Sequence, residues 1–277
     1  MVTGTLFIVG TPIGNLEDLT PRARRLMSEV DVVVCEDTRR TGSLLARAGV
    51  AVPPLLSMFE GNEARRVPEV LAMLRDGRDV AVVTDAGMPA ISDPGFAVVR
   101  VAVEAGIPVR VVPGVSAVTA ALAVSGLPSE RFVFEGFLPR SGRARRERVA
   151  ALLAEPRTIV IFESPRRIVA TLEELHAALG ERSVVVCREL TKLHEEVLRG
   201  TLGEVGRELG RRAAVKGELV VVLAGATSVP ASVEDAVAVA RELQAGGMRK
   251  REAARAAAAR TGASARAVYE ELVAKPK

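Results

Sequence analysis

Short runs of apolar, mostly β-branched residues alternate along the first 225 residues with segments whose apolar positions recur at helical spacing. Most of the runs are continuously apolar, which is typical of strands buried on both faces of a parallel sheet covered by helices. The pattern predicts strands at 6–10, 31–36, 79–85, 108–114, 131–137, 157–164, 182–189 and 217–225. It predicts helices at 20–29, 38–48, 63–76, 95–105, 116–125, 143–154, 168–179 and 202–213. The expected class is therefore α/β.

The predicted strands fall into two sets of four, joined by a helical segment near 113–131. A cleft between two α/β domains is a favoured place for a small ligand. After Pro230 come three helical patterns without a strand, at 232–245, 249–260 and 264–274. The short turn at 261–264 gives the last two the outline of a helix-turn-helix, with Ser264 as the N-cap. The alternative is a helical cap that packs on the second domain. We therefore expect domains at 1–115, 116–228 and 229–277.

The composition excludes several classes of protein. Of the 277 residues, 48% are hydrophobic and 26% charged, which are ordinary globular values. Cys35 and Cys187 stand in apolar runs, so we expect buried free thiols and a reducing compartment. The histidines, His176 and His194, show no metal-ligand spacing, so no metal is expected. No apolar run is long enough to span a membrane, and the first residues lack a basic leader. The expectation is a soluble, cytoplasmic protein without a membrane partner.

Positive charge is concentrated in two places, although the net charge is only +4. Residues 140–148 hold five arginines and one glutamate, and residues 241–277 hold nine basic residues against four acids. Local patches of this kind favour a polyanionic partner. Aromatic residues make up 3% of the chain, so base stacking on aromatic platforms is not the expected mode of recognition.

Loops rich in glycine and proline follow three of the predicted strands, at 9–20, 84–96 and 113–117. In open parallel sheets, ligands bind beyond the carboxyl ends of the strands. The first loop is neither a dinucleotide fingerprint nor a P-loop, and Pro12 lacks the N–H that would hold a phosphate. Each loop alone could be a plain connection, and Ser116 a helix cap. Three of them at successive strand ends predict a small-molecule site.

The motifs in and around these loops are specific enough to suggest a family. They are GTPIGNLEDLTPRA, EDTRRTGSLL, TDAGMPAISDPG, PGVSAVTAALAVSGLP, FEGFLPR, FESPRR and CRELTKLHEE, between residues 10 and 225. The chain resembles the tetrapyrrole methylase superfamily, two-domain α/β methyltransferases with an active-site cleft between the domains. EDTRRT and FESPRR make it most similar to the branch that methylates 16S ribosomal RNA. It departs from many relatives at Gly87-Met88-Pro89, where they carry Gly-Asp-Pro, so a contact from that Asp side chain is not expected.

The resemblance implies a cofactor, a substrate and an assembly. The cofactor is S-adenosyl-L-methionine, and the residues implied to contact it are Pro12, Ile13, Met88, Ile91, Ser116, Ala117, Phe162, Leu190 and Ala224. The implied substrate is the ribose 2′-hydroxyl of cytidine 1402 of 16S rRNA in the 30S subunit, and a homodimer is implied. One alternative is C-methylation of a tetrapyrrole such as uroporphyrinogen or a precorrin, against which EDTRRT, FESPRR and the basic tail argue. Another is a non-enzymatic RNA-binding protein that uses the tail alone.

Alignment of the reacting groups is the main task of such an enzyme, because the sulfonium methyl is already activated. A carboxylate could also take the hydroxyl proton. Glu36, Asp37 and Glu163 are the foremost candidates, and Asp85, Asp93 and Glu189 also follow strands. The alternatives are ion pairs with the neighbouring arginines, or no general base at all.

Arginines beside these strand ends are suited to phosphate, which a guanidinium fork binds well. The expected RNA-binding residues are Arg39, Arg40, Arg140, Arg166, Arg167, Arg249, Lys250 and Arg251. Surface ion pairing is the alternative for the two arginine pairs at the strand ends, Arg39 with Arg40 and Arg166 with Arg167.

Overall fold

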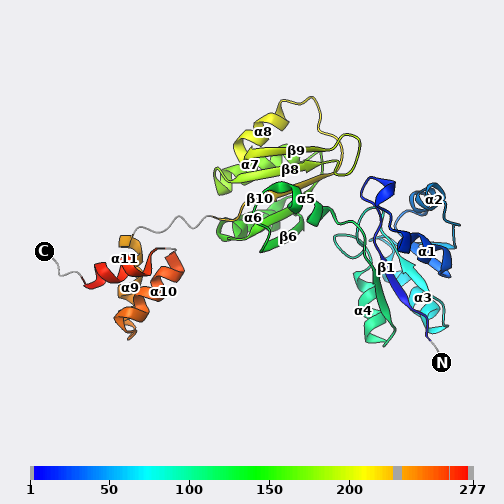
Figure 1. The fold of residues 1–277 in the computed structure, drawn as a ribbon, viewed down its shortest axis with the longest axis horizontal. Coiled ribbons are helices and arrows are strands. Elements are labelled where there is room, and N and C mark those ends of the chain that lie inside the picture. The colour runs from blue at the N-terminus through cyan, green and yellow to red at the C-terminus, as the bar shows by residue number, and fades with distance from the viewer. Residues whose placement is uncertain (1–2, 227–232, 262, 274–277) are drawn as a thin grey trace. The chain divides into compact units, whose positions relative to one another are not determined.

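A computed structural model describes residues 3–226, 233–261 and 263–273 of the chain. The chain divides into two compact units (Figure 1). The larger holds residues 1–153 and 157–224, and the smaller holds residues 154–156 and 225–277. Each unit is described by itself.

The first sheet is entirely parallel, with strand order β3-β2-β4-β1-β5. Its strands are β1 (Leu6–Val9), β2 (Val32–Cys35), β3 (Leu55–Ser57), β4 (Val80–Val82) and β5 (Val109–Val112). The parallel pairing and four of the strands are confirmed, whereas β3, a three-residue edge strand, was not predicted. The first sheet therefore has five strands, where four were predicted.

Helices cover both faces of this sheet and bury its apolar side chains. They are α1 (Pro21–Glu29), α2 (Thr38–Arg47), α3 (Glu63–Arg75) and α4 (Phe96–Glu104), with a 3-10 turn at Leu16–Asp18. Met27 of α1 and Leu45 of α2 lie in one apolar cluster, and Leu74 of α3 and Val98 of α4 lie in another. Since side chains alternate across a strand, both faces of each central strand must be apolar. This explains the continuous runs in the sequence.

The second sheet corrects two expectations. Its order is β6-β7-β10-β8-β9, from β6 (Phe132–Phe137), β7 (Thr158–Glu163), β8 (Ser183–Arg188), β9 (Glu196–Thr201) and β10 (Leu219–Leu223). Only β6 and β7 pair in parallel, and every other pair is antiparallel. It has a fifth strand, β9, which forms a hairpin with β8. The parallel expectation was wrong here because a central strand is apolar on both faces whichever way it runs.

Four more helices belong to this sheet: α5 (Ala117–Ser125), α6 (Gly142–Ala151), α7 (Ile168–Leu179) and α8 (Leu202–Gly210), with a 3-10 turn at Leu152–Ala154. All eight helices predicted in this part of the chain are present. Thr201 begins α8 with a capping box, since its hydroxyl accepts from the Glu204 N–H and the Glu204 carboxylate accepts from the Thr201 N–H. Cys35 and Cys187 are buried free thiols, as expected.

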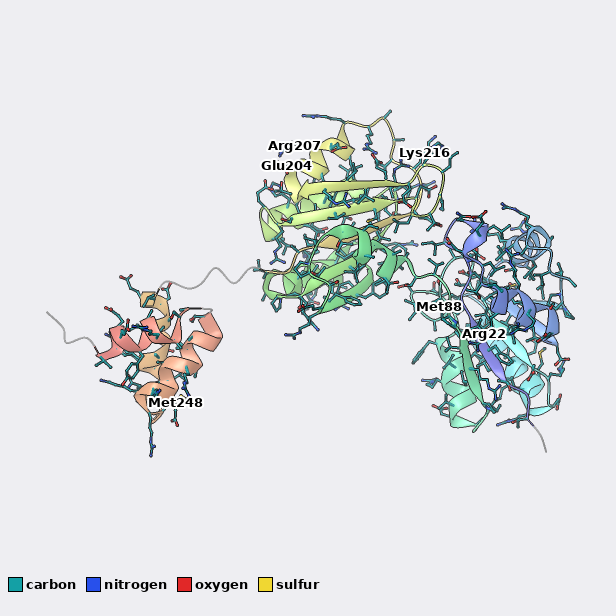
Figure 2. All side chains as sticks on the ribbon, in the orientation of Figure 1. Arg22, Met88, Glu204, Arg207, Lys216 and Met248 are labelled. Carbon is teal, nitrogen blue, oxygen red and sulfur yellow. The ribbon has the colours of Figure 1, made fainter. Side chains whose placement is uncertain are left out.

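The described residues of the smaller unit form a cluster of three helices, α9 (Val233–Ala245), α10 (Lys250–Thr261) and α11 (Ala265–Val273). Met248 lies in the turn between α9 and α10 (Figure 2). Small side chains such as Ala240 and Ala257 form most of its core, which lets the helices approach closely. Ser264 caps α11, because its hydroxyl accepts from the Ala267 N–H at 3.4 Å. The three predicted helices are confirmed, apart from residues 232 and 274, which lie outside the described residues. None of the helices described is long and apolar enough to cross a membrane.

Candidate functional site

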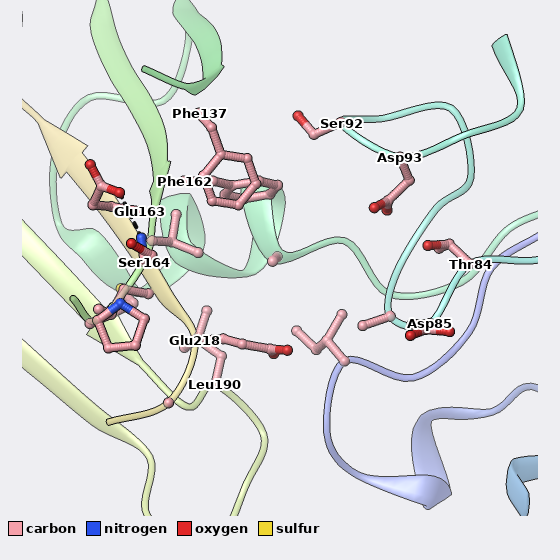
Figure 3. Close-up of a pocket in the computed structure, with 18 of the residues that line it drawn as sticks. Thr84, Asp85, Ser92, Asp93, Phe137, Phe162, Glu163, Ser164, Leu190 and Glu218 are labelled. Carbon is pink, nitrogen blue, oxygen red and sulfur yellow. Dashed lines mark hydrogen bonds between the residues drawn. The ribbon is translucent and has the colours of Figure 1, made fainter. Parts of the chain in front are cut away.

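A cavity of about 460 Å³ opens in the larger unit, and both sheets contribute to its walls (Figure 3). The first sheet supplies the ends of β2 and β4 and the loops that follow. The second supplies the ends of β7 and β8 and the start of β10. Its lining residues are Ile13, Glu36, Arg40, Thr84, Asp85, Ala86, Ser92, Asp93, Ala117, Phe137, Phe162, Glu163, Ser164, Pro165, Cys187, Leu190 and Gly217–Val220.

Carboxylates from the ends of β2 and β4 form one wall of the cavity. Glu36 follows β2, and Asp85 and Asp93 stand in the loop after β4. Asp85 Oδ2 accepts a hydrogen bond from the Arg40 guanidinium at 2.9 Å. Its buried Oδ1 and the buried Thr84 Oγ1 have no hydrogen-bond partner among the described residues. Buried polar atoms are nearly always satisfied, so this wall is prepared for a ligand that donates hydrogen bonds.

The pKa values of two of these acids are raised. Burial and the nearby charges of Asp93 and Asp85 raise the pKa of Glu36. Burial raises the pKa of Asp93, and Asp85 adds to the effect. A cationic group in the cavity would relieve this repulsion. Perturbed carboxylates in a cleft are typical of functional sites.

The opposite wall is mostly apolar and partly aromatic, although Ser164 and Glu218 also line it. Phe162 of β7 meets Phe137 of β6 edge to face, with centroids 5.6 Å apart, and Leu190, Ile13 and Ala117 continue the surface. Figure 3 shows the two rings facing the acidic wall across the cavity. An acidic wall opposite an apolar one suits a cation that carries a flat apolar group.

Glu163 also lines the cavity, but its carboxylate is fully committed to the protein. Its side chain is 0% exposed and pairs with Arg167 at 2.7 Å. It accepts hydrogen bonds from the Thr171 hydroxyl at 2.6 Å and from the Ser164 N–H at 2.7 Å. Thr171 accepts in turn from Arg145 at 2.8 Å. Glu163 therefore forms the ion pair that the sequence offered as the alternative to a role as general base. The same bonds fix the turn that carries Ser164 and Pro165 into the cavity.

Asp37 lies outside the cavity. It is the N-cap of α2, and its Oδ1 accepts from the Arg39 N–H at 2.8 Å. The Arg39 side chain binds the same carboxylate, at 2.9 Å to Oδ2. These bonds hold the pKa of Asp37 far below its usual range. Glu36, unlike Asp37, has no ion pair with any residue that the structure describes.

Four of the residues expected to contact the cofactor line the cavity: Ile13, Ala117, Phe162 and Leu190. Pro12, Met88, Ile91 and Ser116 are in the adjoining loops and do not line it. Ser116 begins α5, yet its side chain makes no capping bond among the described groups. Ala224 follows the last residue of β10 and donates its N–H to Ser183. It lies at the ends of the strands that face away from the cavity, because β10 runs antiparallel to β7 and its start, not its end, faces the cavity.

The glycine of the first loop permits a close crossing of main chains. A Cβ on Gly10 would lie 2.6 Å from the Gly114 nitrogen and 2.7 Å from the Met88 sulfur. The loops after β1, β4 and β5 therefore meet at this point, and Figure 2 shows Met88 in the second of them. Glycine is needed here for loop packing, in addition to any approach of a ligand.

The expected RNA-binding arginines occupy different settings. Arg40 lines the cavity, Arg39 and Arg167 are paired with Asp37 and Glu163, and Arg140 and Arg166 are exposed. Neither Arg140 nor Arg166 has an ion-pair partner among the residues described. Arg249, Lys250 and Arg251 are exposed at the start of α10 in the smaller unit.

Ser92 lies in the loop that the sequence predicted for a ligand, but the sequence missed the lining residues Phe137 and Gly217–Val220. The last group was missed because β10 was expected to be parallel, which would put its start at the far edge. In the described part of the chain, no group of three or more His, Cys, Asp or Glu residues could hold a metal ion.

Residues 5–206 match the family of Tetrapyrrole (Corrin/Porphyrin) Methylases. A protein of Thermotoga maritima named ribosomal RNA small subunit methyltransferase I is 49% identical over 80% of this chain and 99% of its own length. A Mycobacterium tuberculosis protein of the same name is 43% identical over 99% of this chain and 96% of its own.

Solved structures share the fold at lower identity. The methyltransferase CobJ superimposes with a TM-score of 0.61 at 20% identity, covering 81% of this chain and 95% of its own. Uroporphyrin-III C-methyltransferase of Thermus thermophilus, complexed with S-adenosyl homocysteine, gives 0.56 at 22% identity, covering 79% and 96%. The chain therefore belongs to the tetrapyrrole methylase family and, within it, to the group of ribosomal RNA small subunit methyltransferases I.

Proposed function

We propose that the protein transfers a methyl group from S-adenosyl-L-methionine to the 2′-hydroxyl of a cytidine ribose in 16S ribosomal RNA of the small subunit. The names of relatives at 43–49% identity support a small-subunit rRNA substrate. The observation that carries the chemistry is the cavity, where unpaired carboxylate and hydroxyl atoms face an aromatic wall.

The cavity fits this cofactor in charge and in shape. The bound cofactor supplies an electrophilic methyl on a sulfonium cation, and it also carries an ammonium group and an adenine ring. Asp85 Oδ1 and Thr84 Oγ1 are buried acceptors without a partner among the described groups, and they can receive the cofactor's N–H or hydroxyl protons. Phe162 and Leu190 offer an apolar surface to the ring. The neighbouring acids stabilise positive charge in the cavity.

Among the three candidate bases, the geometry favours Glu36. Asp37 points away to Arg39, and Glu163 has both oxygens bound. Glu36 lines the cavity without an ion pair among the described residues, and its pKa is raised. A carboxylate with a raised pKa is a better proton acceptor at neutral pH than an ordinary one. As the ribose oxygen bonded to the methyl carbon, the carbon–sulfur bond would break, S-adenosyl homocysteine would leave and Glu36 would take the hydroxyl proton. Alignment of the reacting groups would lower most of the barrier.

Arg40 at the cavity, exposed Arg140 and Arg166, and the basic start of α10 would bind the RNA backbone. Arg39 and Arg167 contribute through the donors that their ion pairs leave free, since a guanidinium has five N–H groups.

The test is methyl transfer from labelled cofactor to small subunits from a strain that lacks the enzyme. Mapping of 2′-O-methylation should then find one new modified cytidine in 16S rRNA. Uroporphyrinogen is the competing acceptor in a parallel reaction. Transfer to the tetrapyrrole alone would overturn the proposal, and absence of cofactor binding in calorimetry would leave only RNA binding.

We further propose that the protein acts in the cytoplasm as a homodimer. Phe96 and Val103 of α4 are 67% and 62% exposed, and Val111 of the adjacent edge strand β5 is 54% exposed. Large apolar side chains grouped on one face commonly mark an interface. Light scattering should give the mass of a dimer, and the Phe96→Asp substitution should reduce it to that of a monomer.

A further inference from the structure

A second hollow, which we call the α2 groove, is formed by side chains on and just before α2. Its lining residues are Asp37, Arg39, Arg40, Ser43, Leu44 and Arg47, and its volume is about 480 Å³. Residues 39, 43 and 47 are spaced by four, and residues 40, 44 and 47 by four and three. This spacing puts them all along one face of the helix.

The α2 groove has an excess of positive charge. Three guanidinium groups share it with a single carboxylate, that of Asp37. Arg39 binds Asp37 yet remains 90% exposed at its side chain, and Arg40, bound to Asp85, is 73% exposed. Arg47 pairs with no carboxylate in the ranges that the structure describes. The groove therefore presents exposed N–H donors and uncompensated charge to solvent.

Arg40 connects the groove to the cavity. It lines both hollows, and its NH1 lies 2.9 Å from Asp85 Oδ2 in the cavity wall. A chain that leaves the cavity on this side passes Arg40 and enters the α2 groove. A polymer that carries a charge on every monomer would occupy the cavity and the α2 groove at the same time.

We propose that the α2 groove binds a phosphodiester of the RNA strand whose target nucleotide occupies the cavity, with Arg47 and Ser43 as binding residues beside Arg39 and Arg40. This inference rests on the proposed function. Guanidinium forks match the oxygens of a phosphate, and the exposed Ser43 hydroxyl adds a donor. The groove has no aromatic side chain, so it suits the backbone rather than a base.

A basic residue in the last turn of a helix also stabilises the helix through its interaction with the helix dipole. Arg75 provides the control for that role, because it is exposed, stands in the last turn of α3 and has no ion pair among the described residues. Arg47→Ala and Arg75→Ala remove the same charge from equivalent helix positions. Only the first change affects the α2 groove.

The experiment measures binding and methylation of small subunits by the full chain. Arg47→Ala should reduce the salt slope of log affinity by roughly 0.7–0.9, the value for one phosphate contact. It should raise KM for small subunits about tenfold, as the loss of a charged hydrogen bond does, without changing kcat or cofactor affinity. Ser43→Ala should raise KM less, and Arg75→Ala should change neither quantity.

Equal salt slopes for Arg47→Ala and Arg75→Ala would overturn the inference. The salt slope tests the groove even if the wild-type protein methylates no rRNA, an outcome that would refute only the proposed function. A titration with inorganic phosphate distinguishes a site for free anions. Saturation by phosphate that Arg47→Ala abolishes, with an unchanged KM for small subunits, would also overturn the inference.

Discussion

Replacement of Glu36 by glutamine tests the assignment of the proton acceptor. The substitution keeps the shape of the side chain and removes its negative charge and basicity. A positioned general base contributes about 10²–10⁴ in rate, or roughly 2.7–5.4 kcal/mol in the barrier. Because Glu36 has no ion pair among the described residues, the change leaves no charged partner buried alone. We expect single-turnover methyl transfer to slow by that factor, with cofactor affinity within a few-fold of wild type.

Stability and pH dependence should separate this effect from misfolding. Burial raises the pKa of Glu36 above its usual value, so its charged form destabilises the fold as pH rises through the raised pKa. Glu36→Gln should therefore melt at the wild-type temperature or higher at pH 7. The wild-type rate should fall on acidification as Glu36 takes up a proton, and this limb should be absent in the variant.

The adjacent Asp37→Asn substitution is the matched control. Asparagine caps a helix as well as aspartate does, so α2 is preserved, and Asp37 lies outside the cavity. Its rate should stay within a few-fold of wild type. A Glu36→Gln enzyme with the wild-type rate and the same acid limb would refute the reasoning, and a large loss in Asp37→Asn would move the role to Asp37.

Three further outcomes follow from the structure. Glu196→Gln should lower the melting temperature at pH 7 but not near pH 2, since Arg212 lowers the pKa of Glu196 to about 2 and its stabilisation is lost as pH falls from about 4.5; a difference that persists at pH 2 would contradict this. Gly10→Ala should lower the free energy of unfolding by about 1–3 kcal/mol through overpacking, whereas Gly206→Ala in α8, whose Cβ would lie 3.7 Å from Leu172, should leave it unchanged or raise it by up to about 1 kcal/mol in denaturant titrations. Alanine at all three of residues 249–251 should reduce the salt slope of small-subunit binding by roughly 0.7–0.9 for each phosphate that the tail no longer binds, with cofactor affinity unchanged in calorimetry; an unchanged slope would mean that the tail does not bind RNA.

The periodicity of apolar residues predicted the long elements because burial on both faces leaves a strong signal. It missed β3 and β9, whose residues are mostly half-exposed, as is usual for edge strands. It could not give the direction of β10, since VVVL is equally suited to either. For β9 a clue was available: no helix was predicted between 189 and 202, and parallel neighbours require a crossover whereas a hairpin does not.

Strand ends also predicted where the acids would gather, but not how they would pair. Arg40 could reach Glu36 or Asp37 by sequence, yet it binds Asp85, which comes from a neighbouring strand end. Such pairings depend on strand order, which a local pattern does not contain. Strand direction also decides which end of β10 faces the cavity. Ala224, at the end of β10, was expected to line the cavity and does not, whereas Gly217–Val220, at its start, do.

The position of β10 has a consequence for the order in which the molecule can assemble. The first sheet is complete once the chain has been made to Val112, and all its strands are close in sequence. The second sheet has its last strand in the middle, between β7 and β8, so those two cannot be joined until Leu223 has left the ribosome. Loop closure over such separations is slow compared with local contacts. Gly217–Val220 also complete the cavity wall. A nascent chain thus carries a finished first sheet while the cavity still lacks the part of its wall that Gly217–Val220 provide.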